Sequence, residues 1–193
     1  RDKKRVSKID SAWLHLHYKI VVGLVLFAFL VECFMALLIV NSDLLSTTVG
    51  IYIWKFIVFP TGVNLHAVIV GAVAVKSKRF SQTQKIYVVS LVFSFTCFVL
   101  FVVHHSFSAT YYLFAMAIVL TTVYVNYRVT TVTALISITA MVVTELFIKW
   151  DLDKISIFES MDRLGDFLVA IFIIAGCYLA CMVEISYGKQ KNE

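Results

Sequence analysis

The sequence predicts an all-α membrane protein, a bundle of six transmembrane helices with its N and C termini in the cytoplasm. Three observations support this prediction. Apolar residues make up 61% of the 193 residues and charged residues only 15%, against about 45–50% and about 25% in soluble domains. The apolar residues gather in six long runs. The Lys and Arg residues are concentrated between alternate runs, on one side of the predicted bundle.

Each of the six runs is close to the length that a helix needs to cross a bilayer. A hydrocarbon core of about 30 Å takes about 20 helical residues, with a range of about 17–25. The fourth run is the shortest. Barrel strands would alternate apolar and polar residues, whereas the first twelve residues of the first run, IVVGLVLFAFLV, are apolar on every side, as in a helix surrounded by lipid. The predicted spans are Ile20–Val40, Phe56–Val75, Ile86–Val103, Thr110–Val125, Val129–Ile148 and Leu164–Ile185.

The distribution of charge gives the orientation. With six helices both termini share a side, and the segments on that side hold thirteen of the seventeen Lys and Arg residues but four of the twelve Asp and Glu residues. The positive-inside rule places this side in the cytoplasm. Residues 1–19 form a basic juxtamembrane segment suited to anionic lipid headgroups, residues 20–185 form the membrane domain, and residues 186–193 begin a cytoplasmic linker. The expected partner is the lipid bilayer, and no nucleic acid is expected on so short a basic arm.

The second predicted span begins with an ambiguous segment. From Leu44 to Val75 the sequence has no obvious loop, yet one helix of that length would measure about 48 Å. Leu44–Phe59 mixes aromatic residues and Lys55 with apolar neighbours, which favours a helix in the outer interface that turns into the membrane at Pro60. The alternative is a single long, kinked second span.

Ionisable and strongly polar residues fall mostly in the outer half of the predicted bundle. Such groups are costly in lipid, usually face the bundle interior or water, and mark functional sites. They predict a pocket for an unknown small-molecule ligand. Its candidate residues are Glu32, Asn64, His66, His104, His105, Glu145 and Asp166.

Each candidate also has a structural interpretation. His104 and His105 end the third span and could simply face water. Asp166, at the start of the last span, suits the positive end of a helix dipole. Glu32 has no cation within a helical turn, so it is protonated, paired across helices or lining water.

No catalytic motif appears in the chain. Walker-type glycine loops, HExxH and GxSxG are absent from the sequence. The four cysteines lie inside predicted spans and lack zinc-site spacings, so no metal site is predicted. A haem held between helices would need two histidines at matching depth, and His66 lies too deep to match His104. No cofactor is therefore predicted.

Three stretches of the chain carry a resemblance to a known family. AWLHLHYKIVVGLVLFAFLVE, IYIWKFIVFPTGVNL and VYVNYRVTTVTALIS resemble the N-terminal six-helix membrane sensor module of bacterial diguanylate cyclases. In these proteins a GGDEF catalytic domain follows the last helix. The resemblance implies a sensory input domain in the bacterial inner membrane, working as a homodimer and regulating a cytoplasmic enzyme that makes cyclic di-GMP. This chain contains no GGDEF motif, so residues 186–193 would lead to an output domain outside it.

Other functions stay open at this point. A small proton-coupled transporter could use Glu32 and His66 as a proton relay. A haem- or quinone-binding electron carrier and a purely structural anchor are further alternatives.

Overall fold

All regular structure among the described residues is helical. The structure is a computed structural model that describes residues 2–42, 47–104, 107–151 and 154–191. Its elements in chain order are α1 (Asp2–Val40), α2 (Val49–Ile53), the π-helical η1 (Trp54–Val58), α3 (Phe59–Lys76), α4 (Gln82–Val103), the 3₁₀-helical η2 (Ser108–Tyr112), α5 (Leu113–Thr121), the 3₁₀-helical η3 (Thr122–Tyr124), α6 (Tyr127–Phe147) and α7 (Met161–Gln190).

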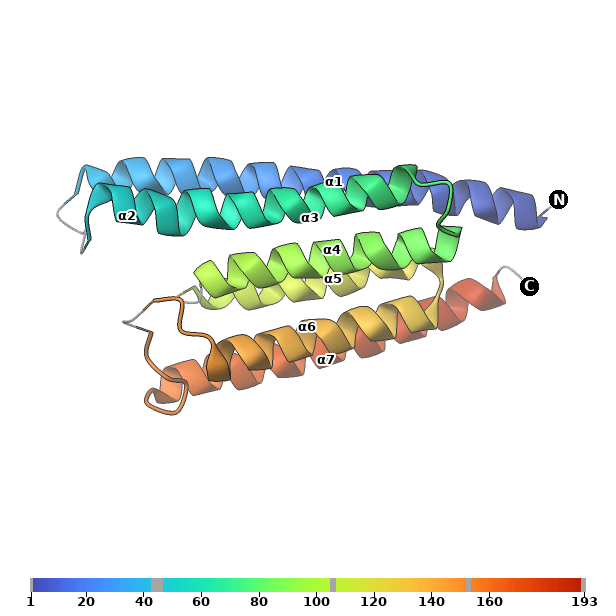
Figure 1. Ribbon diagram of the computed structural model, residues 1–193. Helices are drawn as coiled ribbons and strands as arrows, with labels where there is room; N and C mark the ends of the chain where they lie inside the picture. The colour runs from blue at the N-terminus through green and yellow to red at the C-terminus, as the bar shows by residue number, and fades with distance from the viewer. Residues whose placement is uncertain (1, 43–46, 105–106, 152–153, 192–193) are drawn as a thin grey trace.

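The helices run nearly parallel or antiparallel to one another, and both ends of the chain lie at the same end of the bundle (Figure 1). The α4 and α5 helices lie between a pair formed by α1 with α3 and a pair formed by α6 with α7. Within its apolar stretch, α4 is 67% buried, against 22% for α1 and for α7. The α4 helix is therefore the centre of the bundle.

The described residues confirm the prediction of an all-α chain. Five of the described helices are long and apolar enough to cross a membrane, which supports the prediction of membrane-spanning helices. They are Asp10–Val40, Val49–Lys76, Gln82–Val103, Tyr127–Phe147 and Met161–Gln190. The predicted span Thr110–Val125 falls instead in a shorter apolar helix, Ser108–Tyr124. That helix combines 3₁₀ and α turns. At about 2.0 Å per 3₁₀ residue and 1.5 Å per α residue, it still measures about 30 Å.

The interfacial helix predicted for Leu44–Phe59 is wrong from Val49 onward. The chain forms one continuous helix, Val49–Lys76, as in the alternative of a single long second span. The π turn of η1 directly precedes Pro60, and the Phe59 N–H donates to the carbonyl of Trp54, five residues back. Since proline lacks an N–H and crowds the preceding turn, a wider turn lets the helix continue without a break. Leu44 itself lies outside the described residues.

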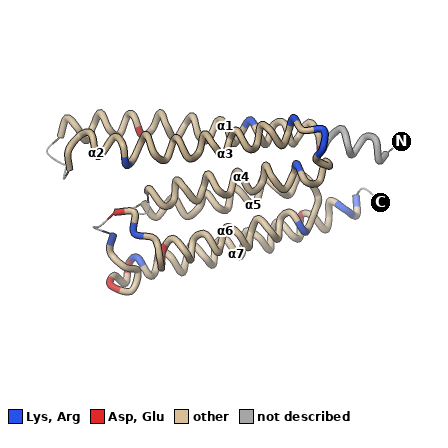
Figure 2. Tube along the Cα trace, in the orientation of Figure 1, with Lys and Arg blue, Asp and Glu red and all other residues tan. Residues whose placement is uncertain are grey.

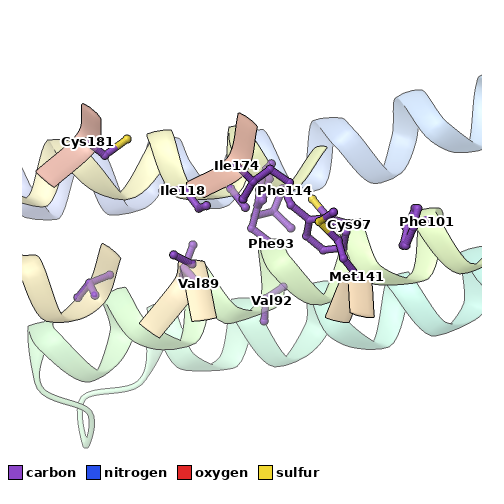
Figure 3. Packing of buried hydrophobic residues seen from close by; sticks show 14 of the residues in the cluster. Val89, Val92, Phe93, Cys97, Phe101, Phe114, Ile118, Met141, Ile174 and Cys181 are labelled. Atoms are coloured by element: carbon purple, nitrogen blue, oxygen red, sulfur yellow. The ribbon is translucent and has the colours of Figure 1, made fainter. Parts of the chain in front are cut away.

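The core is formed by large apolar side chains from the inner faces of the helices (Figure 3). Phe93, Phe114 and Met141 are fully buried, and the rings of Phe101 and Phe114 meet edge to face with centroids 5.7 Å apart. Outward-facing positions are apolar too, since Phe27 is 66% exposed and Phe172 80% exposed. Soluble proteins rarely expose apolar surface on this scale, so these faces fit a lipid environment.

Charged residues gather at the two ends of the bundle and are sparse between them (Figure 2). The end that carries the termini shows mainly Lys and Arg. The opposite end, with the connection from α6 to α7, shows both signs. We call this opposite end the outer end.

Candidate functional site

A cavity of about 600 Å³ lies in the outer half of the bundle. Its walls come from α1, α2, η1, α4, η2 and α5, and from Asp151 in the connection after α6. Most of the lining is apolar, with Phe27, Phe56 and Leu100 among its members. The polar lining includes Glu32 and Asp151, so this is an apolar chamber with a small number of strongly polar groups.

Glu32 and His104 meet across this cavity. A carboxylate oxygen of Glu32, on α1, contacts the Nε2 of His104. Glu32 is only 7% exposed. His104 follows the last residue of α4, and its backbone leaves helical geometry. Its backbone N–H still donates to the carbonyl of Leu100. The end of α4 thus presents the imidazole to the one acidic residue of α1's apolar stretch.

The rim of the cavity is fixed by a second pair. Lys55 Nζ, on η1, donates to Asp151 Oδ1 at 3.0 Å. The ring of Tyr52 packs on that of Phe56, with centroids 4.9 Å apart, and both residues line the cavity. The continuous helix through η1 therefore brings an aromatic pair and a salt bridge to the outer rim.

Glu145 belongs to a separate cluster beside α6 and α7. Its side chain is fully buried and accepts a hydrogen bond from the Tyr111 hydroxyl at 2.8 Å. Lys154 Nζ lies 3.5 Å and Arg163 Nη2 3.4 Å from the carboxylate. Lys154 also donates to the carbonyls of Thr144, at 2.6 Å, and Ile148, at 3.1 Å. These contacts hold the connection between α6 and α7 against the end of α6.

The pKa of Lys154 reflects this enclosure. Burial lowers the pKa of its amine from the ordinary value, while the Glu145 carboxylate acts in the opposite direction. The net pKa is lowered, so burial destabilises the charged amine more than the Glu145 carboxylate stabilises it.

The remaining predicted residues lie apart from the cavity. Asp166 is exposed and accepts a hydrogen bond from the Ser108 hydroxyl. Asn64 is buried on α3, and no described group bonds to its Oδ1. The His66 imidazole lies 2.7 Å from the carbonyl of Gly62 in its own helix and lines a different, apolar groove between α3 and α4. His105 lies outside the described residues.

The structure thus brings together two of the seven predicted residues, Glu32 and His104. Glu32 and His66 line different cavities, so the geometry does not form the relay suggested for a transporter. His66 and His104 likewise do not face one another across a common site.

Sequence reasoning missed a buried polar group at the end of the bundle that carries the termini. His17 is fully buried, and its Nδ1 lies 3.0 Å from the Tyr124 hydroxyl. Trp13 Nε1 donates to the carbonyl of Leu120 at 3.2 Å. The spacing of the sequence could have predicted this burial, because Trp13, His17 and Val21 follow one another every four residues and so share one helix face.

Among the described residues, no group of three or more His, Cys, Asp or Glu side chains could hold a metal ion. All four cysteines are free. The described lining of the cavity offers two carboxylates, an imidazole and aromatic rings for binding.

Comparison with known proteins adds no relative. No family model, no curated protein and no solved structure matches this chain. The function is therefore argued from the geometry of the cavity and from the bundle around it.

Proposed function

We propose that this chain is a membrane-embedded signal-input domain that binds a small molecule in its outer cavity and regulates a cytoplasmic enzyme. The observation that carries the proposal is the Glu32–His104 pair, buried in a cavity of about 600 Å³ and joining two helices. Ligand pockets have volumes of about 300–1,000 Å³ and combine apolar walls with a few polar groups.

The proposed topology has six spans, with Ser108–Tyr124 as the fourth. Its length of about 30 Å matches the hydrocarbon thickness. An even number of spans agrees with both termini lying at one end of the bundle (Figure 1), and the positive-inside rule puts that end in the cytoplasm. The location in this proposal is the inner membrane of a bacterium.

The signal would travel along helices that join the two ends of the bundle. A ligand can act only by binding two packings of the protein with different affinity. The Glu32–His104 contact links α1 to α4 at the outer end, and α1, with 39 residues, is about 58 Å long. The α7 helix has 30 residues and runs unbroken to Gln190, so a change in packing can reach the cytoplasmic end.

The proposed output is a diguanylate cyclase, on the strength of the resemblance in the AWLHLHY, WKFIVFP and VYVNYRV stretches. A cyclase domain forms its two-fold product as a dimer, so the proposal includes a homodimer of this module. A change in the relative orientation of paired α7 helices would then control the distance between two catalytic domains.

A chimera tests this function. Residues 1–193 are joined through α7 to a dimerisation-dependent diguanylate cyclase domain, and cyclic di-GMP is measured in a bacterium lacking its own cyclases. We expect Glu32→Gln to change the output about fivefold or more, the range typical of coupling between sites. Glu159→Gln is the matched control, because Glu159 is an exposed acid of the outer end that does not line the cavity. Equal output from wild type and Glu32→Gln would contradict the proposal.

The reading frame beyond the codon for Glu193 gives an independent test. A catalytic domain following α7 at short distance supports an input domain. A stop codon directly after Glu193 would argue for a protein that acts on its own.

A further inference from the structure

We infer that the outer cavity binds a small organic cation, an ammonium group carried on a compact apolar body. The ammonium would lie at Glu32, and the body would lie against the apolar wall of α1 and α4. The inference names the ligand class of the site under the proposed function, and rests on that function for its role in signalling.

The Glu32 carboxylate has unfilled acceptor capacity. An ionised carboxylate has about four acceptor positions. Among the described residues, one contact reaches this carboxylate, from His104. The comparison with Glu145 is direct, since that buried carboxylate is approached by a phenol and two cations. A buried carboxylate with so few donors favours a ligand that brings N–H groups, because leaving a buried acceptor unpaired is unfavourable.

The charged side chains that line the cavity also favour a cationic ligand. Its described lining contains two carboxylates, Glu32 and Asp151, and neither Lys nor Arg. The neighbouring Lys55 is engaged by Asp151 at 3.0 Å. An anionic ligand would therefore meet the Glu32 carboxylate with neither Lys nor Arg beside it in the described lining, whereas a cation would be attracted by that carboxylate.

The aromatic and apolar wall of the cavity also favours a cation that carries an apolar body. Aromatic rings of Phe27, Tyr52, Phe56 and Phe107 line the chamber, and the faces of such rings attract cations. Phe27 is 66% and Phe107 58% exposed, so the chamber opens at the side of the bundle. An apolar body can reach it from lipid, while a strongly hydrated ion without such a body would leave most of the wall uncovered.

Binding of an ammonium also supplies a mechanism for the signal. The ammonium takes acceptor positions on the same carboxylate that the His104 imidazole contacts, and its positive charge weakens the attraction of that carboxylate for the imidazole, so ligand binding weakens the contact between α1 and α4. That contact is a polar link between the two helices at the outer end. The ligand therefore favours a packing in which α1 is freed from the end of α4.

The test uses three probes with the same apolar cage and different headgroups: adamantan-1-amine, adamantan-1-ol and adamantane-1-carboxylate. Each is titrated calorimetrically into the full chain in lipid nanodiscs, with empty nanodiscs to subtract partitioning into lipid. We expect saturable binding of the amine, about tenfold or more tighter than the alcohol or the carboxylate, because hydrogen bonds to charged groups contribute about 1.5–3 kcal/mol. Equal or tighter binding of the alcohol or the carboxylate, or no saturable binding of the amine, overturns the inference.

Variants locate the binding. Glu32→Gln keeps the shape of the side chain and removes its charge, so it should weaken the amine about tenfold or more. Ala28→Phe, which fills the chamber from α1, should abolish binding of all three probes. Glu159→Gln should bind the amine as wild type does. Retained amine binding in both cavity variants, with circular dichroism showing folded protein, would contradict the assignment. The headgroup series on the unmodified chain decides the question even if a variant fails to fold.

The same probes separate this inference from the proposed function. Amine binding without any change in the output of the cyclase chimera would sustain the ligand class and contradict the signalling role. A chimera that responds to Glu32→Gln, combined with absent amine binding, would sustain the signalling role and contradict the ligand class.

Discussion

Two buried carboxylates in the outer half of the bundle are surrounded very differently. Glu145 is enclosed by two cations and a tyrosine hydroxyl, whereas Glu32 meets only His104 among the described residues. A carboxylate whose partners come from three parts of the chain stabilises the framework. One that faces a cavity with a single partner remains able to bind something else.

We therefore expect Glu145→Gln to destabilise the protein much more than Glu32→Gln does. Removing the charge of Glu145 leaves Lys154 buried without its carboxylate, and breaking a buried ion pair in this way costs about 3–5 kcal/mol. The free energy of unfolding in detergent measures the difference. Glu159→Gln, an exposed control, should stay within about 0.5 kcal/mol of wild type. A Glu145→Gln protein as stable as wild type would refute the framework role.

Lys154 gives the folded protein a defined dependence on alkaline pH. Its pKa is lowered in the folded state below the ordinary 10.5, so between the two pKa values the unfolded chain binds more protons. Stability from this group therefore rises as the pH rises toward 10.5. Lys154→Met should flatten that rise in an unfolding series at increasing pH. An unchanged slope in the variant would show that another group is responsible.

At the scale of elements, hydropathy located the membrane helices but not their internal geometry. The apolar runs identified the five long helices and the shorter Ser108–Tyr124. The break expected at Pro60 is absent because a π turn shifts the hydrogen-bond register before the proline. The pattern of apolar residues in the sequence does not reveal such a shift. The candidate site shows the same limit. Depth along a helix could be counted from the sequence, and it placed Glu32 and His104 in one half. The direction in which each side chain points around its helix axis could not be counted in this way. The sequence therefore did not reveal that Glu145 and Asp166 lie outside the cavity.

The connection between η3 and α6 contains a strained residue. Val125 has φ of 49°, a left-handed conformation that costs a residue with a Cβ atom about 1–2 kcal/mol. We expect Val125→Gly to stabilise the protein relative to Val125→Ala by about 1 kcal/mol, because both lose the valine side chain and only glycine removes the penalty. Thermal unfolding of the two variants gives the comparison. A less stable glycine variant would mean that packing outweighs strain at this turn.

At the scale of the whole molecule, the separation of charge along the bundle gives a direct test of the topology. We expect the loop between α3 and α4 to face the cytoplasm and the connection between α6 and α7 to face outward. Lys78→Cys and Glu159→Cys place one exposed thiol on each side. A membrane-impermeant maleimide should label the second variant on intact cells and the first only after permeabilisation. The opposite pattern would invert the bundle, and labelling of both on intact cells would contradict an even number of spans.

The unequal lengths of two apolar helices have a consequence for a bilayer that surrounds the bundle. Val49–Lys76 has 28 residues and is about 42 Å long, whereas Ser108–Tyr124 measures about 30 Å. Since the helices lie nearly parallel (Figure 1), one helix cannot tilt on its own to remove the mismatch. In a bilayer we therefore expect the lipid beside the outward-facing Met116 and Val119 of α5 to be thinner than the lipid beside α2 and α3. A protein of this shape would impose a thickness gradient on a membrane around its own circumference.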